Sequence, residues 1–150
     1  MFIQAFFEGI IAALGALVLE LSPPILGFAL VETTLLFLLF TATVEEIIKY
    51  IFIYNHYSKL KTPAQTKILA SAFFIGAGFA FIDIFFKLAS TEKNVFLSFL
   101  GILLVHLFTT TILGVFFLKN KSKSFFLGVF FIGLNILLHF CYNFLILSLN

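Results

Sequence analysis

Long apolar stretches separated by short polar breaks are the main pattern along this 150-residue chain. A membrane-spanning helix needs about 20 predominantly apolar residues. The stretches predict spans at about residues 2–20, 25–56, 67–88, 95–118 and 125–147. We therefore predict a single all-α domain over residues 1–150, a polytopic transmembrane helix bundle of about five spans.

The breaks set the predicted boundaries. Ser22-Pro23-Pro24 is expected to end the first span, because proline interrupts a helix and restricts the residue before it. That span contains Glu8 and has no basic start, so it is a poor secretion signal. The second stretch is unusually long, roughly 48 Å at 1.5 Å per residue. Three alternatives stay open for this stretch: it tilts in the membrane, it protrudes from the membrane, or it breaks near residues 41–43.

Composition supports a membrane protein. The chain is 62% hydrophobic and 11% charged, with a mean hydropathy of +1.18. A soluble domain of this composition would have too few polar residues to cover its apolar surface. A formal charge of +2, dispersed along the chain, does not indicate nucleic acid as a partner. The single cysteine, Cys141, excludes a disulfide framework.

Lysines predict the orientation in the lipid bilayer. They gather around two of the predicted loops, as Lys59, Lys61 and Lys67 and as Lys119, Lys121 and Lys123. With five spans both loops fall on one side, which the positive-inside rule makes cytoplasmic. We predict a multi-pass protein of the cell membrane with its N-terminus in the cytoplasm and its C-terminus outside. A sixth span, created by a break at 42, would place both loops outside.

Several ionisable residues lie inside the predicted spans, although each costs about 2.5–3.5 kcal/mol at the membrane centre. They are Glu8, Glu32, Glu45, Glu46, Lys49, Asp83, His106 and His139. Counted from the cytoplasmic ends, Glu46, Asp83, His106 and His139 lie at depths of about 15 to 24 Å. Four helices thus bring acid or imidazole groups near the middle of the membrane, which predicts a functional site there.

Helical spacing predicts that these groups face inward. Three spans carry small or polar stripes at i, i+4 spacing: Ala72, Gly76 and Ala80, with Asp83 one turn on; His106, Thr110 and Gly114; and Asn135, His139 and Asn143. Small stripes favour close helix contact, and polar stripes face a bundle interior.

Four motifs in this order resemble those of PrsW-type intramembrane proteases. Residues 43–49, T-V-E-E-I-I-K, are similar to the E-E-x-x-K motif, and residues 76–83 resemble the G-x-G-F-A run that ends in an acid. His106 and the segment 139–143 are similar to the later histidine motifs. The superfamily of CAAX-processing and bacteriocin-processing proteases has its motifs in the same order. The resemblance covers about residues 40–145.

The resemblance implies a glutamic-type endopeptidase that needs no cofactor and cuts a membrane-embedded or membrane-delivered protein or peptide. It implies catalytic roles for Glu45, Glu46, His106 and His139, with support from Lys49, Asp83 and Asn143. Within this set we expect Glu46 to activate water and His139 to hold the water or polarise the carbonyl. Asn143 is expected to orient His139 or to donate to the oxyanion.

Other interpretations stay open. Glu45 with Lys49, and Asp83 with Lys87, are spaced for ordinary intrahelical ion pairs. Glu8 and Glu32 are expected to contact a partner or the lipid edge. Midplane acids also occur in proton-coupled transporters, although no two related halves are evident here.

A metal site is a further alternative, because Glu46, His106 and His139 suit zinc, but no H-E-x-x-H helix is present. The chain has no arginine, and Ile84 follows Asp83 where these proteases usually carry Glu-Asn. These departures leave room for an inactive membrane subunit that binds a partner helix. A homo-oligomer also stays open.

Overall fold

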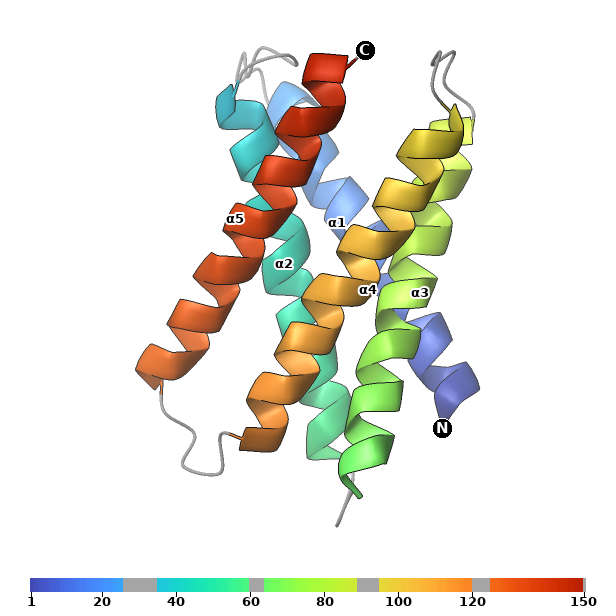
Figure 1. Ribbon diagram of the computed structural model, residues 1–150, viewed down its shortest axis with the longest axis vertical. Helices are drawn as coiled ribbons and strands as arrows, with labels where there is room; N and C mark the ends of the chain where they lie inside the picture. The colour runs from blue at the N-terminus through green and yellow to red at the C-terminus, as the bar shows by residue number, and fades with distance from the viewer. Residues whose placement is uncertain (26–34, 60–63, 89–94, 120–124, 150) are drawn as a thin grey trace.

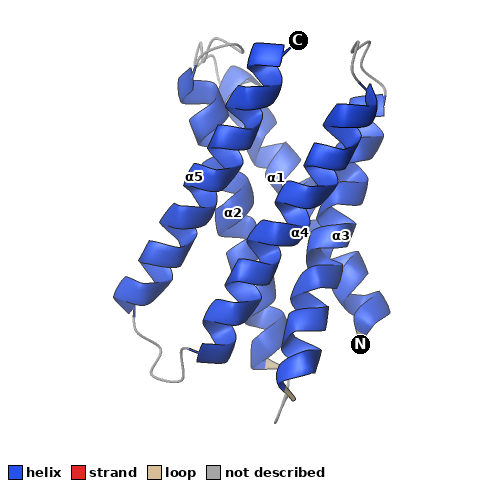
Figure 2. Ribbon diagram, in the orientation of Figure 1, coloured by secondary structure: helices blue, strands red, loops and turns tan. Residues whose placement is uncertain are grey.

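The computed structural model describes residues 1–25, 35–59, 64–88, 95–119 and 125–149, and each of these parts is one long helix (Figures 1 and 2). The helices are α1 (Phe2–Ile25), α2 (Leu35–Ser58), α3 (Gln65–Leu88), α4 (Val95–Lys119) and α5 (Phe125–Leu149). Each has 24 or 25 residues and is therefore about 36 Å long, enough to cross a hydrocarbon layer of about 30 Å. The predicted all-α bundle is confirmed.

The distribution of side chains is the reverse of that in a soluble protein. Large apolar side chains such as Phe126, Phe108 and Val18 are exposed, whereas Glu46 and Lys49 are fully buried. The helices α1, α3, α4 and α5 are long and apolar enough to span a membrane. The chain is thus a multi-pass membrane protein. The remaining helix, α2, is not among these four, but it has the same length and buries its charged residues among the other helices.

The five helices form one bundle in which α3 packs between α1 and α4 (Figure 1). α2 contacts all four other helices, and α5 packs only against α2 and α4 among the described residues. The two termini lie at opposite ends of the bundle, as an odd number of spans requires (Figure 1). The C-terminal ends of α2 and α4 lie at the same end of the bundle as the N-terminus (Figure 1); Lys59 follows α2, and Lys119 is the last residue of α4.

Glycines let the central helices approach closely. A Cβ added at Gly9 of α1 would overlap the backbone carbonyl of Ile75 in α3, and one at Gly76 of α3 would overlap the Thr110 hydroxyl of α4. Without a side chain at these positions the helix backbones come into van der Waals contact, which is how membrane helices gain packing energy. The predicted close contact along the stripe that contains Gly76 is confirmed.

The end of the first helix was predicted wrongly. α1 does not stop before Ser22 but continues through Pro23 and Pro24 to Ile25. Proline at 23 has no N–H to bond the carbonyl of Leu19, and the Ser22 hydroxyl donates to that carbonyl instead, at 2.7 Å. Such a hydroxyl satisfies the freed carbonyl and lets a membrane helix accommodate proline.

The structure describes most of the predicted second span, 25–56, namely the part from Leu35 onward. Residues 26–34, which include Glu32, lie outside the described residues. From Leu35 onward α2 is continuous, so the alternative break at 41–43 does not occur. Thr41 and Thr43 instead donate their hydroxyls to the carbonyls of Leu38 and Leu39, which threonine commonly does inside a membrane helix. The bounds of α3, α4 and α5 agree with the predicted ones within two residues.

Candidate functional site

The buried face of α2 carries most of the charged side chains in the bundle interior. Its buried residues recur at helical spacing and are Thr41, Ala42, Glu45, Glu46, Lys49, Ile53 and His56. Spacings of three and four place side chains on one face of a helix. This face meets α4 and α5, which supply the histidines described below.

Lys49 forms a close ion pair with Glu46 and a longer one with Glu45. Its Nζ lies 2.7 Å from Glu46 Oε1 and 3.9 Å from Glu45 Oε2. The ammonium also lies 3.5 Å from the Thr109 hydroxyl and 4.6 Å from the centre of the Phe79 ring. Both charged side chains of the pair are fully buried, so each depends on the other for compensation. Glu45 is left without a close cationic partner.

Two histidines, one from α4 and one from α5, are each held by a carboxylate. His139 Nδ1 lies 2.8 Å from Glu46 Oε1, and His106 Nε2 lies 2.8 Å from Asp83 Oδ2. The two rings are 5.2 Å apart and nearly perpendicular. A hydrogen bond at one ring nitrogen decides which nitrogen carries the proton and which keeps a lone pair. Each imidazole therefore presents its other nitrogen to the middle of the group.

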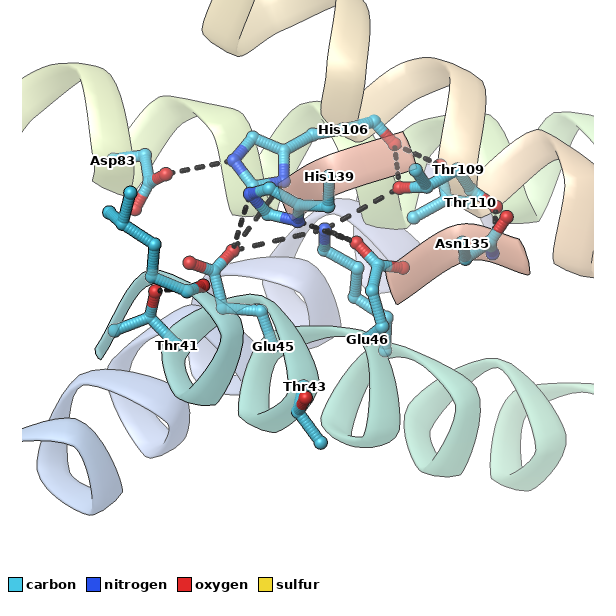
Figure 3. Close-up of polar contacts among 12 residues, drawn as sticks. Thr41, Thr43, Glu45, Glu46, Asp83, His106, Thr109, Thr110, Asn135 and His139 are labelled. Carbon is cyan, nitrogen blue, oxygen red and sulfur yellow. Dashed lines mark hydrogen bonds and ion pairs between the residues drawn. The ribbon is translucent and has the colours of Figure 1, made fainter. Parts of the chain in front are cut away.

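Three atoms face the middle of this group of side chains (Figure 3): Glu45 Oε2, His106 Nδ1 and His139 Nε2. Glu45 Oε2 lies 3.7 Å from His139 Nε2 and 3.9 Å from His106 Nδ1, distances too long for hydrogen bonds. Neither Glu45 Oε2 nor His106 Nδ1 has a hydrogen-bond partner among the described residues, although both atoms are buried. We call Glu45, Glu46, Lys49, Asp83, His106 and His139 the central cluster.

Known proteins do not identify this arrangement. No family model, no curated protein and no solved structure matches the chain. The resemblance to PrsW-type proteases therefore stays a prediction from the motifs.

Neighbouring polar residues fix α4 and α5 around the central cluster. The Thr110 hydroxyl donates to the His106 carbonyl at 2.7 Å, and the Asn135 amide donates to the Thr109 carbonyl at 2.9 Å (Figure 3). Asn135 and both threonines are fully buried. The Asn135 bond crosses from α5 to α4, so it sets the distance between the two helices that carry the histidines. Thr109 was not predicted, although it lies one turn from His106.

Asp83 is the exposed edge of the central cluster. Its side chain is 38% exposed, whereas that of Glu45 is 10% exposed and that of His139 is 2% exposed. The other members are fully buried. Asp83 is therefore the member of the central cluster with the most exposed side chain.

Of the seven predicted site residues, six meet in the central cluster and one does not. No hydrogen bond or ion pair involves Asn143 in the described part of the chain, and the expected contact with His139 is made by Glu46 instead. The alternative metal set of Glu46, His106 and His139 stays a prediction, and the geometry of the described residues favours Glu45 in place of Glu46. The ligand-type atoms that lie within 4.8 Å of one another belong to Glu45, His106 and His139, because Glu46 is engaged by Lys49.

A second polar cluster lies nearer the lysine-rich end of the bundle. Glu8 Oε2 lies 2.5 Å from His56 Nδ1, and His56 Nε2 lies 3.1 Å from the Ser71 hydroxyl. The other Glu8 oxygen accepts a hydrogen bond from Gln4 and lies 3.6 Å from Lys59 Nζ. We call Glu8, His56 and Ser71 the end cluster. Glu8 is thus paired within the chain, contrary to the predicted partner or lipid contact, and His56 was not predicted at all.

Proposed function

We propose that this protein is a membrane-embedded hydrolase that cuts a peptide bond of a membrane-embedded or membrane-delivered substrate. The central cluster is the site of this reaction. One observation carries the proposal: a carboxylate oxygen of Glu45 that has no hydrogen-bond partner among the described residues faces two imidazoles, and each imidazole is held from behind by another carboxylate. Hydrolysis requires a water molecule and a base that is free to take its proton.

The surroundings of the two adjacent glutamates favour Glu45 as this base. Glu46 is held by Lys49 and His139, so taking up a proton there would break an ion pair in the bundle interior. Glu45 has no such bonds on the oxygen that faces the histidines. We therefore assign the base to Glu45, and not to Glu46 as the sequence led us to expect. Glu46 and Asp83 are positioning residues that orient the imidazoles.

A water molecule between Glu45 and His139 gives one proton to the Glu45 carboxylate while its oxygen attacks the carbonyl carbon of the peptide bond. The tetrahedral intermediate collapses when the carbon–nitrogen bond breaks. The proton held by Glu45 passes to the leaving amine, and the products are a carboxylic acid and an amine.

The sequence motifs and the lysine positions support two further parts of the proposal, the protein family and the orientation in the membrane. We infer membership of the PrsW type, since the motif residues Glu45, Asp83, His106 and His139 converge although they come from four helices. We infer a cytoplasmic N-terminus and an external C-terminus in the cell membrane, because Lys59 and Lys119 follow helix ends on the N-terminal side of the bundle. The substrate then reaches the cluster past Asp83.

The test uses the full chain, purified in detergent and incubated with a pool of transmembrane and lipidated peptides. Mass spectrometry compares wild type with Glu45→Gln and His139→Ala. A matched control, Glu8→Gln, removes a glutamate that also pairs with a histidine but lies in the end cluster. We expect new peptide ends with wild type and the control, and none with the two cluster variants.

Two results would speak against this assignment. Cleavage that persists in both Glu45→Gln and His139→Ala would place the chemistry elsewhere or in a contaminant. Absence of cleavage by wild type, both in detergent and after reconstitution into liposomes, would favour the non-catalytic membrane subunit.

A further inference from the structure

The three atoms in the middle of the central cluster all carry lone pairs. A carboxylate accepts hydrogen bonds and does not donate. The ring nitrogens bonded to Asp83 and Glu46 therefore carry the hydrogens of His106 and His139. The inner nitrogens then point their lone pairs toward Glu45 Oε2, at 3.7 and 3.9 Å. Facing acceptors repel one another unless something positive lies between them.

A water molecule alone does not resolve this arrangement. Water donates two hydrogens, whereas three acceptor atoms meet here, so one acceptor would stay unsatisfied in a buried place. An unsatisfied buried acceptor costs about 1–3 kcal/mol, and more when it is charged. A metal ion accepts lone pairs from all three atoms at once.

The charge of the cluster favours a divalent cation. Glu20 of α1 also interacts electrostatically with Glu45, Asp83 and Lys49, so it belongs to the same charge balance. With neutral imidazoles and ionised carboxyl groups, Glu20, Glu45, Glu46 and Asp83 stand against the single ammonium of Lys49, which leaves three negative charges in excess. Excess charge inside a membrane is costly. One divalent ion would lower this excess to a single negative charge.

We propose that Glu45 Oε2, His106 Nδ1 and His139 Nε2 bind one Zn²⁺ ion. Two imidazoles and a carboxylate, with one position left for water, form a common donor set of catalytic zinc. Tetrahedral bonds of about 2.0–2.1 Å place neighbouring donor atoms about 3.3 Å apart. The two distances to Glu45 Oε2 exceed this value by about half an ångström, so small rotations of the side chains complete the site.

The residues behind the histidines support the same conclusion. Metal-binding imidazoles usually donate their second N–H to a carboxylate, which fixes the ring and makes the ligand more basic. Both histidines have this partner, Asp83 for His106 and Glu46 for His139, and each bond is 2.8 Å long. Lys49 is turned toward Glu46 and stays 3.9 Å from the Glu45 oxygen, so it does not occupy the metal position.

The metal would supply what the proposed reaction otherwise lacks. The inner nitrogens cannot donate to the negative oxygen of the tetrahedral intermediate, because both carry lone pairs. Zinc binds such an oxygen and also makes its own water acidic. In the zinc-bound form Glu45 would act as a metal ligand and no longer as the base, and the metal would take over the activation of the water. The binding of zinc follows from the geometry alone, and only this catalytic consequence rests on the proposed function.

The experiment measures metal on the full chain, purified through a tag that contains no histidine. The protein is stripped with a chelator, supplied with Zn²⁺ at micromolar free concentration, desalted, and analysed by mass spectrometry for metal and by amino-acid analysis for protein. We expect about one zinc per chain in wild type and in the control Glu8→Gln. We expect less than about one tenth of that in Glu45→Gln and in His106→Gln.

Cobalt provides a measurement that needs no variant. Co²⁺ in place of Zn²⁺ should give the visible absorption of a tetrahedral site, and added Zn²⁺ should remove it. Circular dichroism and gel filtration show that each variant keeps its helices and its size. Failure of stripped wild type to take up either ion would overturn the site, as would equal uptake by wild type, Glu45→Gln and His106→Gln.

The same samples distinguish a failure of the zinc site from a failure of the proposed hydrolase. Peptide cleavage at an unchanged rate by the stripped protein would overturn the catalytic role of zinc and leave the hydrolase standing. One bound zinc with no cleavage of any peptide would confirm the metal site and count against the hydrolase.

Discussion

The bundle contains two clusters in which a glutamate meets a histidine, and they differ in what their histidines do. In the end cluster, His56 uses both ring nitrogens within the chain, one toward Glu8 and one toward Ser71. In the central cluster, His106 uses one ring nitrogen, toward Asp83, and its other nitrogen is buried without a hydrogen-bond partner in the part of the chain that the structure describes.

This difference separates a structural contact from a site. A cavity of about 10 Å³ beside His56 and Ser71 holds a single water molecule at most, so a substrate has no room there despite the order Glu–His–Ser. The end cluster ties α1 to α2 and α3. The central cluster leaves lone pairs unused, and groups of that kind are available to bind or to react. Whether the second ring nitrogen of the histidine is hydrogen-bonded therefore distinguishes the two clusters better than the identity of their residues does.

The largest contrast is expected between Glu45→Gln and Glu8→Gln. Loss of the Glu45 carboxylate should lower peptide cleavage by about 10²–10⁴-fold, the usual effect of removing a catalytic base or an essential ligand. Glu8→Gln should leave the rate within about threefold, since its carboxylate serves packing. Initial rates from labelled peptides, measured at equal amounts of folded protein, make the comparison. Equal losses in the two variants would mean that the clusters do not differ in kind.

Lys49→Met tests how strongly the central cluster is held together. The substitution leaves the Glu46 carboxylate buried without its ammonium, which should lower the free energy of unfolding by about 3–5 kcal/mol. Thermal unfolding in detergent, followed by circular dichroism, measures the loss. The double variant Lys49→Met/Glu46→Gln should recover much of it, because both charges are then gone. A double variant as unstable as the single one would contradict the ion pair as the cause.

Asp83→Asn tests the partner behind one histidine. The amide keeps the size of the side chain but removes the charge that orients and polarises His106. We expect zinc affinity and cleavage rate to fall by about 10–100-fold, with the helices unchanged. A zinc titration against a competing chelator measures the affinity. Ser71→Ala, which removes the corresponding partner of His56 in the end cluster, is the control and should change neither quantity.

Gly9→Ala should affect the end cluster and spare the central one. A Cβ at position 9 would overlap the Ile75 carbonyl and push α1 away from α3, at a cost of about 1–3 kcal/mol in the free energy of unfolding. The central cluster draws its residues from α2 to α5, so cleavage per folded molecule should persist. Gly15→Ala, on the same helix, meets nothing within 4 Å and should be neutral or slightly stabilising. A loss of cleavage without loss of stability would contradict this division.

Most of the fold could be predicted from the sequence, because lipid imposes a simple rule on composition and length. The starts and ends of α3, α4 and α5 follow directly from apolar length between polar breaks. The end of α1 could not be predicted in this way. The usual reading of Pro23 as a breaker ignores the Ser22 hydroxyl, which supplies the missing bond.

The candidate site was predictable in its members but not in its pairings. The cost of ionisable groups in lipid is enough to select Glu45, Asp83, His106 and His139. Which glutamate Lys49 would hold depends on the side-chain directions at i+3 and i+4, and both are compatible with a helix. His56 escaped notice because it lies at the edge of a predicted span, although it shares the buried face of Lys49 and Glu46.

The way α5 is attached bears on how the protein is made. Only about a tenth of its apolar span is buried, and its hydrogen bonds to the rest of the described bundle come from Asn135, His139 and Tyr142. Helices enter the bilayer in the order of synthesis, so α5 follows α2 and α4 and brings His139 with it. A nascent chain that still lacks α5 holds Glu45 and His106 but not the complete central cluster. The three atoms that face one another therefore come together only after α5 has joined the helices made before it.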